Sequence, residues 1–195
     1  MRCRRKFAAG LVLFALFGGV AACSPSTGHM STSQGTLATA VPTSVNEVDM
    51  HFIAMMTPHH EQAVQMSDIV LAAQDVSPQT KDIAQRIKDG QQTEIDQMLE
   101  WADQWGMSSM MSGHSMHVAN GMLTADQLAT LESLTGPEVE RVFLEQMIYH
   151  HEGAMAMTQG EVGGGGFTEL TELAQYMIEV QSAEVIEMNR LLIAL

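Results

Sequence analysis

Two pairs of adjacent histidines are the residues of this chain whose type and spacing best suit chemistry. His59 and His60 lie in the stretch FIAMMTPHHEQAVQM, and His150 and His151 lie in the similar stretch FLEQMIYHHEGAMAM. Methionines accompany both pairs, at Met56, Met66, Met147 and Met157. Imidazole nitrogens bind copper in either oxidation state, and thioether sulfurs favour Cu(I). The two pairs therefore predict an internal site for one or two copper ions.

The two histidine stretches belong to a duplication. A shift of 91 residues aligns the first block with its copy, and a shift of 90 residues aligns a second block. The first block comprises Phe52, Met56, His59, His60, Glu61, Ala63 and Met66, and the second comprises Ala84, Gln85, Gln91, Glu94 and Met98. The chain is therefore expected to contain two copies of one helix pair.

Helical periodicity places the histidines on the first helix of each pair. Phe52, Met56, His59, Ala63, Met66 and Val70 recur at alternating spacings of four and three, which is one stripe of a helix. His59 lies on this inward stripe, whereas His60 lies about 100° round the helix on its flank. Pro58 falls inside the pattern and predicts a bend or a local break just before the histidines.

The complete pattern predicts an all-α fold, a four-helix bundle built from a duplicated helix pair. Long helices are expected over about 46–73, 77–106, 136–159 and 168–195, with a short extra helix over about 124–134 in the middle connection. The repeats would span about 46–106 and 136–195, and the connection would begin with a loop over 107–123. The run GEVGGGG is expected to end the third long helix at about Gln159, and Thr168 to cap the fourth.

Two glutamates fall on apolar stripes of the second and fourth long helices. Glu94 lies three residues after Gln91 on a face shared with apolar side chains, and Glu184 repeats this arrangement. A buried carboxylate is costly unless it is paired, and the histidines are the candidates to pair it. Two alternatives stay open here: a direct His–Glu pair that only fixes helix packing, or a shared metal ion.

The loop over 107–123 is a second candidate site for soft metals. Its segment MSSMMSGHSMH carries four methionines and two histidines, namely Met107, Met110, Met111, Met116, His114 and His117. Thioethers have no proton to lose near neutral pH, so they can bind Cu(I) in an oxidising or acidic compartment. We therefore expect this loop to bind Cu(I) or silver, although a plain linker is the alternative.

Residues 1–22 have the features of a lipoprotein signal peptide. Four basic residues precede the apolar stretch FAAGLVLFALFGGV, and VAAC resembles a lipobox that ends at Cys23. We expect lipid on Cys23, a flexible tether over 23–45 and the helical domain over 46–195. The protein would then be exported and anchored to the cell membrane, facing the periplasm or the extracellular side. An ordinary cleaved signal with a chance cysteine is the alternative.

The charge and the motifs exclude several classes of function. Four of the nine basic residues lie in the signal, which leaves five basic against 23 acidic residues, a net charge of −18 without histidine. Such a chain is not expected to bind nucleic acid. It contains no Glu-x-x-His motif of di-iron bundles, no His-Glu-x-x-His motif and no phosphate-binding loop. We therefore expect neither an enzyme nor an organic cofactor.

The two histidine stretches, with IKDGQQTEIDQMLEW, resemble the domain of unknown function 305 family over about residues 46–195. The resemblance implies a ferritin-like four-helix bundle that is exported or lipid-anchored, and some members are associated with periplasmic copper binding. It points to His59, His60, His150 and His151 as the site. Pro58 before one pair and Tyr149 before the other indicate that the two sites differ in geometry.

The function expected from the sequence is sequestration or transfer of copper by a lipid-anchored protein of the envelope. The expected partners are a metal ion and, through the lipid, a membrane. A second copy of the chain or another envelope protein stays open as a partner. The alternative function is that of a structural or partner-binding lipoprotein, accessory to a membrane complex. A redox enzyme of ferritin type is a third interpretation, and it would require iron or manganese.

Overall fold

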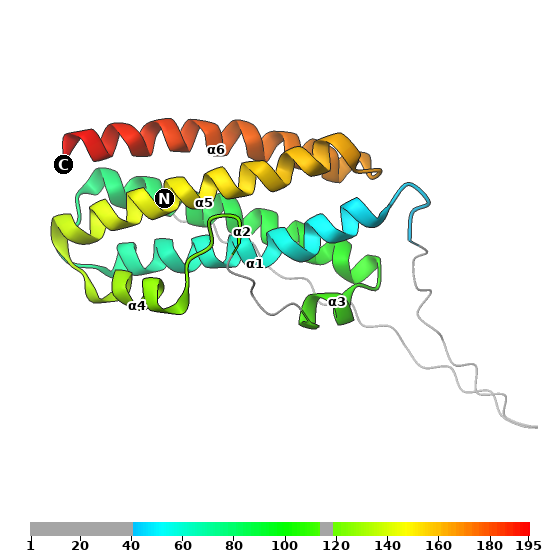
Figure 1. Cartoon of the computed structure of the whole chain (residues 1–195), viewed down its shortest axis with the longest axis horizontal. Helices are drawn as coiled ribbons and strands as arrows, with labels where there is room; N and C mark the ends of the chain where they lie inside the picture. The colour runs from blue at the N-terminus through cyan, green and yellow to red at the C-terminus, as the bar shows by residue number, and fades with distance from the viewer. Residues whose placement is uncertain (1–40, 114–118) are drawn as a thin grey trace, which may run out of the picture. The chain divides into compact units, whose positions relative to one another are not determined.

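The protein forms a bundle of long helices, seen in the computed structural model of Figure 1, which describes residues 41–113 and 119–195. Its helices are α1 (Glu47–Ala72), α2 (Pro78–Gln104), α3 (Ser108–Gly113), α4 (Ala125–Ser133), α5 (Gly136–Gly164) and α6 (Thr168–Ala194). No β-strand occurs in these residues. The predicted all-α class is confirmed.

The four long helices are arranged as two antiparallel pairs. Helix α1 packs along α2, and α5 packs along α6 (Figure 1). The pairs meet chiefly through α1 and α5, whereas α2 and α6 approach each other at few points. Helices α1 and α5 are antiparallel, because Asn46 at the start of α1 bonds the Gly164 carbonyl, and Gly136 at the start of α5 bonds the Gln74 carbonyl. The first helix of each repeat thus lies at the centre.

Local capping signals set most helix starts where the sequence predicts them. Asn46 and Asp49 form a capping box at α1, and Thr124 and Gln127 form one at α4. Ser77 caps α2 with proline in the first turn. These contacts satisfy backbone N–H groups that lack partners inside the helix.

Several local predictions differ from the structure. Helix α1 continues through Pro58, so the local break, one of the two outcomes predicted there, does not occur. The segment expected as loop from residue 107 contains α3. Helix α5 continues to Gly164 instead of ending near Gln159, and its last residue contacts the start of α1, where Asn46 donates to the Gly164 carbonyl.

Thr168 does not cap α6, although α6 begins there. The N-cap position is Phe167, and no side chain caps it. The carboxylate of Asp49 on α1 instead accepts hydrogen bonds from the backbone N–H groups of Gly166 and Phe167. The α5–α6 turn is therefore held by α1, a long-range contact that no local sequence signal carries.

The buried core consists of two apolar clusters. One comprises Ala63, Met66, Val70, Ile83, Ala84, Ile87, Leu123, Leu131, Val139, Phe143, Leu144, Met147 and Met188. The other comprises Phe52, Ile53, Ala54, Met56, Met98, Ala102, Trp105, Met107, Ala154, Leu170, Ala174 and Met177. On each long helix, polar residues separate the two clusters: His59–His60, Gln91–Glu94, His150–His151 and Gln181–Glu184. We call this set the histidine layer.

The predicted signal peptide, lipidation site and most of the tether lie outside the described residues, as do His114, Met116 and His117. Among the described helices, none is both long and apolar enough to cross a membrane.

Candidate metal centre in the histidine layer

All four histidines of the layer are buried, with exposed fractions of 0–1 %. The prediction that His59 faces inward is confirmed, and His60, predicted on the flank of the same helix, is buried as well. Helix α2 packs against that flank of α1 and covers His60, and α6 covers His151 in the same way. Each helix pair therefore encloses one of its two histidines within the pair, and presents the other to the opposite pair.

The enclosed histidines bond directly to the buried glutamates, which is one of the two alternatives that the sequence left open. The Nε2 atom of His60 lies 2.7 Å from Glu94 Oε2, and the Nε2 atom of His151 lies 2.8 Å from Glu184 Oε2. The two distances are nearly equal, so the two repeats retain the same His–Glu bond at equivalent positions. Each pair joins the two helices of its own repeat and satisfies a carboxylate that is less than a tenth exposed.

His59 and His150 meet across the interface between the repeats. Their ring centroids lie 3.7 Å apart, and the ring planes make an angle of 36°. The Nε2 atom of His59 lies 2.9 Å from the backbone carbonyl oxygen of Asn120. His150 has no hydrogen-bond partner on either ring nitrogen within the described part of the protein.

The hydrogen bonds leave ring nitrogens free to bind a ligand. Carboxylate and carbonyl oxygens accept, so Nε2 is the donor in His59, His60 and His151. In the neutral imidazole, Nδ1 then carries the lone pair, and none of these Nδ1 atoms has a partner among the described residues. Buried polar atoms normally have partners, so this set of lone pairs is the feature that a metal would explain.

Burial keeps the two facing histidines neutral. Removal from water lowers the pKa of His59 to about 3, although the Asn120 carbonyl opposes the shift. Burial also lowers the pKa of His150 well below its ordinary value, and the neighbouring His59 adds to this effect. A neutral ring is the form that binds a metal ion, so protons compete weakly for these two sites.

The observed side-chain positions do not by themselves complete a metal centre. Within residues 41–113 and 119–195, no three His, Cys, Asp or Glu side chains lie close enough to hold one ion together. The rings of His59 and His150 are tilted by 36° with centroids only 3.7 Å apart, too close to hold an ion between them. A shared ion at this pair therefore requires at least one ring to turn.

The methionines of the prediction lie on both sides of the layer. Met56, Met66 and Met147 are fully buried. Met56 lies in the apolar cluster that contains Phe52, and Met66 and Met147 lie in the cluster that contains Phe143. Met157 is only partly buried and lines a separate cavity between α1 and α5. The three buried thioethers are the candidates to supply sulfur next to the histidines.

Met107 differs from the other loop methionines. It is 2 % exposed and packs in the core beside Trp105, so it is not part of an open loop as predicted. Met111 is partly buried against the same cluster, and Met110 is 40 % exposed.

The segment that closes over His59 is a feature that the sequence analysis missed. The side-chain amide of Gln62 donates to the Leu123 carbonyl at 3.0 Å and accepts from the Leu123 N–H at 2.6 Å. At the equivalent position of the second repeat stands Gly153, where a Cβ would lie 1.7 Å from the Asn120 carbonyl oxygen. The two repeats thus use one position differently to hold residues 119–123 against the histidine layer. The only sequence signal for this packing was the difference between Gln62 in HHEQ and Gly153 in HHEG.

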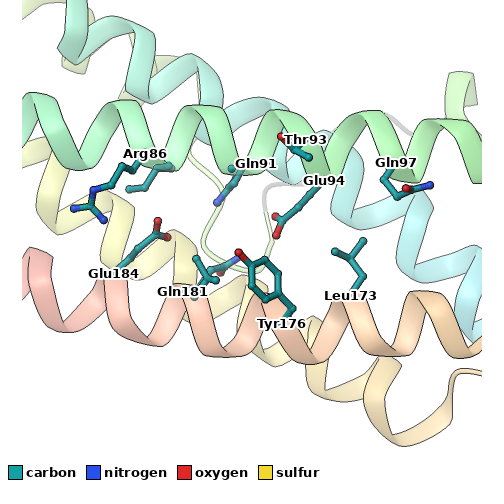
Figure 2. A pocket seen from close by; sticks show the side chains of 12 residues that line it. Arg86, Gln91, Thr93, Glu94, Gln97, Leu173, Tyr176, Gln181 and Glu184 are labelled. Carbon is teal, nitrogen blue, oxygen red and sulfur yellow. The ribbon is translucent and has the colours of Figure 1, made fainter.

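The glutamates of the layer also line a groove between α2 and α6. Figure 2 shows Gln91 and Glu94 projecting from α2 towards Gln181 and Glu184 on α6. The groove has a volume of about 470 Å³, and Arg86 and Tyr176 also line it. Each carboxylate therefore links this groove to a buried imidazole.

The fold and the layer define a class: a duplicated helix pair whose buried histidines are supported by glutamates of the partner helix. The chain matches the family model of the domain of unknown function 305 (DUF305) over residues 49–192, and it belongs to that family.

Solved structures of the family agree with this fold. A DUF305 fragment from Deinococcus radiodurans is 26% identical with a TM-score of 0.71, and the match covers 77% of this chain and 99% of that one. CopM in its Cu(II)-bound form is 33% identical with a TM-score of 0.64, covering 74% and 95%. A DUF305 protein from Streptomyces coelicolor, described as secreted, is 29% identical with a TM-score of 0.69, covering 78% and 94%. A comparison with curated proteins found no match.

Proposed function

We propose that this protein binds copper in the bacterial envelope, to sequester the ion or pass it on, with Cu(I) as the favoured form. The observation that carries the proposal is the set of buried Nδ1 atoms in the histidine layer, which have no partner among the residues that the structure describes. Glu94 and Glu184 orient two of the rings, as carboxylates do behind metal-binding histidines. CopM, a relative of similar fold, has been solved with Cu(I) and with Cu(II).

The proposed ligands of the internal centre are the four imidazoles, with the buried thioethers as further donors. They are His59, His60, His150, His151, Met56, Met66 and Met147. Turning of the neighbouring His59 and His150 rings would bring their nitrogen lone pairs towards a common ion. We propose that the connecting segment with Met110, Met111, His114, Met116 and His117 is a second binding region.

The proposal includes export, lipid attachment at Cys23 and a binding role without catalysis. The signal-like residues 1–22 support export, and the Streptomyces coelicolor relative is described as a secreted protein. The net charge of −18 outside the signal favours attraction of cations to the surface.

The test is titration of the protein, purified without a histidine tag, with Cu(I) against a competing chelator. We expect at least about one equivalent to bind at micromolar free metal, and less uptake would refute the proposal. Replacing His114, His117, Met110, Met111 and Met116 together should remove one class of site and leave binding in the histidine layer.

A structural lipoprotein is the second candidate, and the direct His–Glu bonds favour it. Glu94 and Glu184 already have partners at 2.7 Å and 2.8 Å, so they need no ion. Under this alternative, His59→Ala and His150→Ala would lower the melting temperature equally with and without copper. Under copper binding, both variants would lose the stabilisation that copper gives to the wild type.

A further inference from the structure

A cavity between α1 and α5 is lined by a second group of metal-binding side chains. Its volume is about 230 Å³, and its walls include His51 and Met55 of α1 and Met157 and Glu161 of α5. His51 and Met55 are four residues apart in the sequence, as are Met157 and Glu161, so the two residues of each helix lie one turn apart on one face. The cavity thus brings together one imidazole, two thioethers and one carboxylate.

The four side chains differ in exposure in a way that suits a site open to solvent. His51 is exposed, Met55 and Met157 are partly buried, and Glu161 is only 1 % exposed. Neither carboxylate oxygen of Glu161 receives a hydrogen bond from a donor in the described residues. A buried acid without a donor on the wall of a cavity is costly, and a cation would reduce that cost.

The other repeat shows that packing does not require these residues. The duplication places Val142, Gln146, Met66 and Val70 at the positions of His51, Met55, Met157 and Glu161 respectively. Of these four, Met66 and Val70 belong to an apolar core cluster, and Val142 packs against it. Three of the four equivalents are thus apolar and the fourth is Gln146, so the His, Glu and second Met are specific to one end of the bundle.

We propose that this cavity is a separate binding site for a soft monovalent cation, Cu(I) or Ag(I). The Met55 and Met157 sulfurs and the His51 imidazole would be the ligands, and Glu161 would balance the charge by releasing its proton when the cation binds. Thioether and imidazole together select soft cations. Hard cations such as Mg²⁺ or Ca²⁺ need several oxygen ligands, and this cavity offers a single carboxylate. The inference goes beyond the proposed function, because His51, Met55 and Glu161 are not part of the internal centre.

The position of the cavity connects it to the histidine layer. Asn120 lines the cavity, and its carbonyl oxygen accepts the hydrogen bond from His59. An ion held here would therefore lie on the solvent side of the backbone segment that covers His59. The site is placed to take an ion from solution before the buried imidazoles do.

The test is titration of the full purified chain, labelled with ¹³C at the methionine methyl groups, with Ag(I). We expect the Met55 and Met157 methyl signals to shift in the wild type. In the His51→Gln/Met55→Leu variant, the Met157 signal should stay in place over the same range, and silver uptake should fall by about one equivalent. Unchanged movement of the Met157 signal, or unchanged uptake, would overturn the proposal.

The controls separate this site from the internal centre. Met177→Leu replaces a buried methionine outside both sites and should leave the Met55 and Met157 shifts and the uptake unchanged. Silver in the histidine layer would move the buried Met56 and Met147 signals, whether or not Met157 responds. Because His51 is exposed and Met55 only partly buried, far-UV circular dichroism should show intact helices in the variant.

Discussion

The imidazole rings of His59 and His150 lie against each other across the interface between the two repeats, with centroids 3.7 Å apart and ring planes tilted by 36°. Two protonated rings at this distance would repel each other inside an apolar core. Burial prevents this by lowering the pKa of both rings, that of His59 to about 3. The repeats can therefore pack closely only with both rings neutral, which is also the form that binds a metal.

The apo protein should lose stability as the pH falls below about 6.5. The unfolded chain protonates His59 near its ordinary pKa of 6.5, whereas the folded chain does so only near 3. Between these pH values the unfolded state binds more protons than the folded state. The ring of His59 therefore makes the free energy of unfolding fall by about 1.4 kcal/mol for each pH unit of acidification. Urea unfolding in the presence of a chelator, between about pH 6.5 and about pH 4, measures the slope.

His59→Gln provides the comparison for this prediction, because glutamine keeps an N–H group that can reach the Asn120 carbonyl. The variant should unfold with a slope smaller by about 1.4 kcal/mol per pH unit. His51→Gln replaces an exposed histidine and should retain the wild-type slope. Equal slopes for wild type and His59→Gln would show that His59 does not resist protonation.

Glu161→Gln should stabilise the protein at pH 8 more than at pH 5. Burial first, and then the neighbouring Asp49, raise the pKa of Glu161 to about 8. The folded state therefore binds more protons than the unfolded state between 4.5 and 8, and stability is lost as the pH rises through this range. Glutamine imitates the protonated acid and removes the loss. Melting temperatures at both pH values test this, and Glu145→Gln, exposed on the same helix, should change neither.

Gly153→Ala should destabilise the protein by roughly 1–3 kcal/mol, because the new Cβ would lie 1.7 Å from the Asn120 carbonyl oxygen. The matched control is Gly160→Ala on the same helix, where no atom lies within 4 Å of the new Cβ. That variant should gain up to about 1 kcal/mol from helix propensity. Denaturant unfolding of both proteins gives the comparison, and a neutral Gly153→Ala would mean that residues 119–123 do not pack on α5.

Glu94→Ala should cost about 1–3 kcal/mol, because it leaves the buried Nε2 of His60 without an acceptor. Glu94→Gln keeps an acceptor oxygen and should cost less. Asp82→Ala removes an exposed ion pair with Arg86 and should change the free energy of unfolding by at most about 1 kcal/mol. Chemical denaturation without metal measures all three, and equal losses for the alanine and glutamine variants at position 94 would contradict the hydrogen bond.

Much of the architecture is encoded locally and is therefore readable from the sequence. The spacing of Phe52, His59 and Met66 follows the helical period, and a residue on an apolar stripe is buried wherever the helix packs. Asn46 and Ser77 cap their helices with side-chain bonds to N–H groups two or three residues away. Burial of His59 and the need of Glu94 for a partner follow from these local facts.

The sequence by itself thus determined the helices, the duplication and the presence of histidines and glutamates in the core. Only the tertiary structure decided that His60 pairs with Glu94 while His59 faces His150, because this depends on which helix covers each flank. It also decided that His51 and Met157, 106 positions apart, line one cavity. Such contacts join distant segments, and their geometry is set by helix packing rather than by any period along the chain.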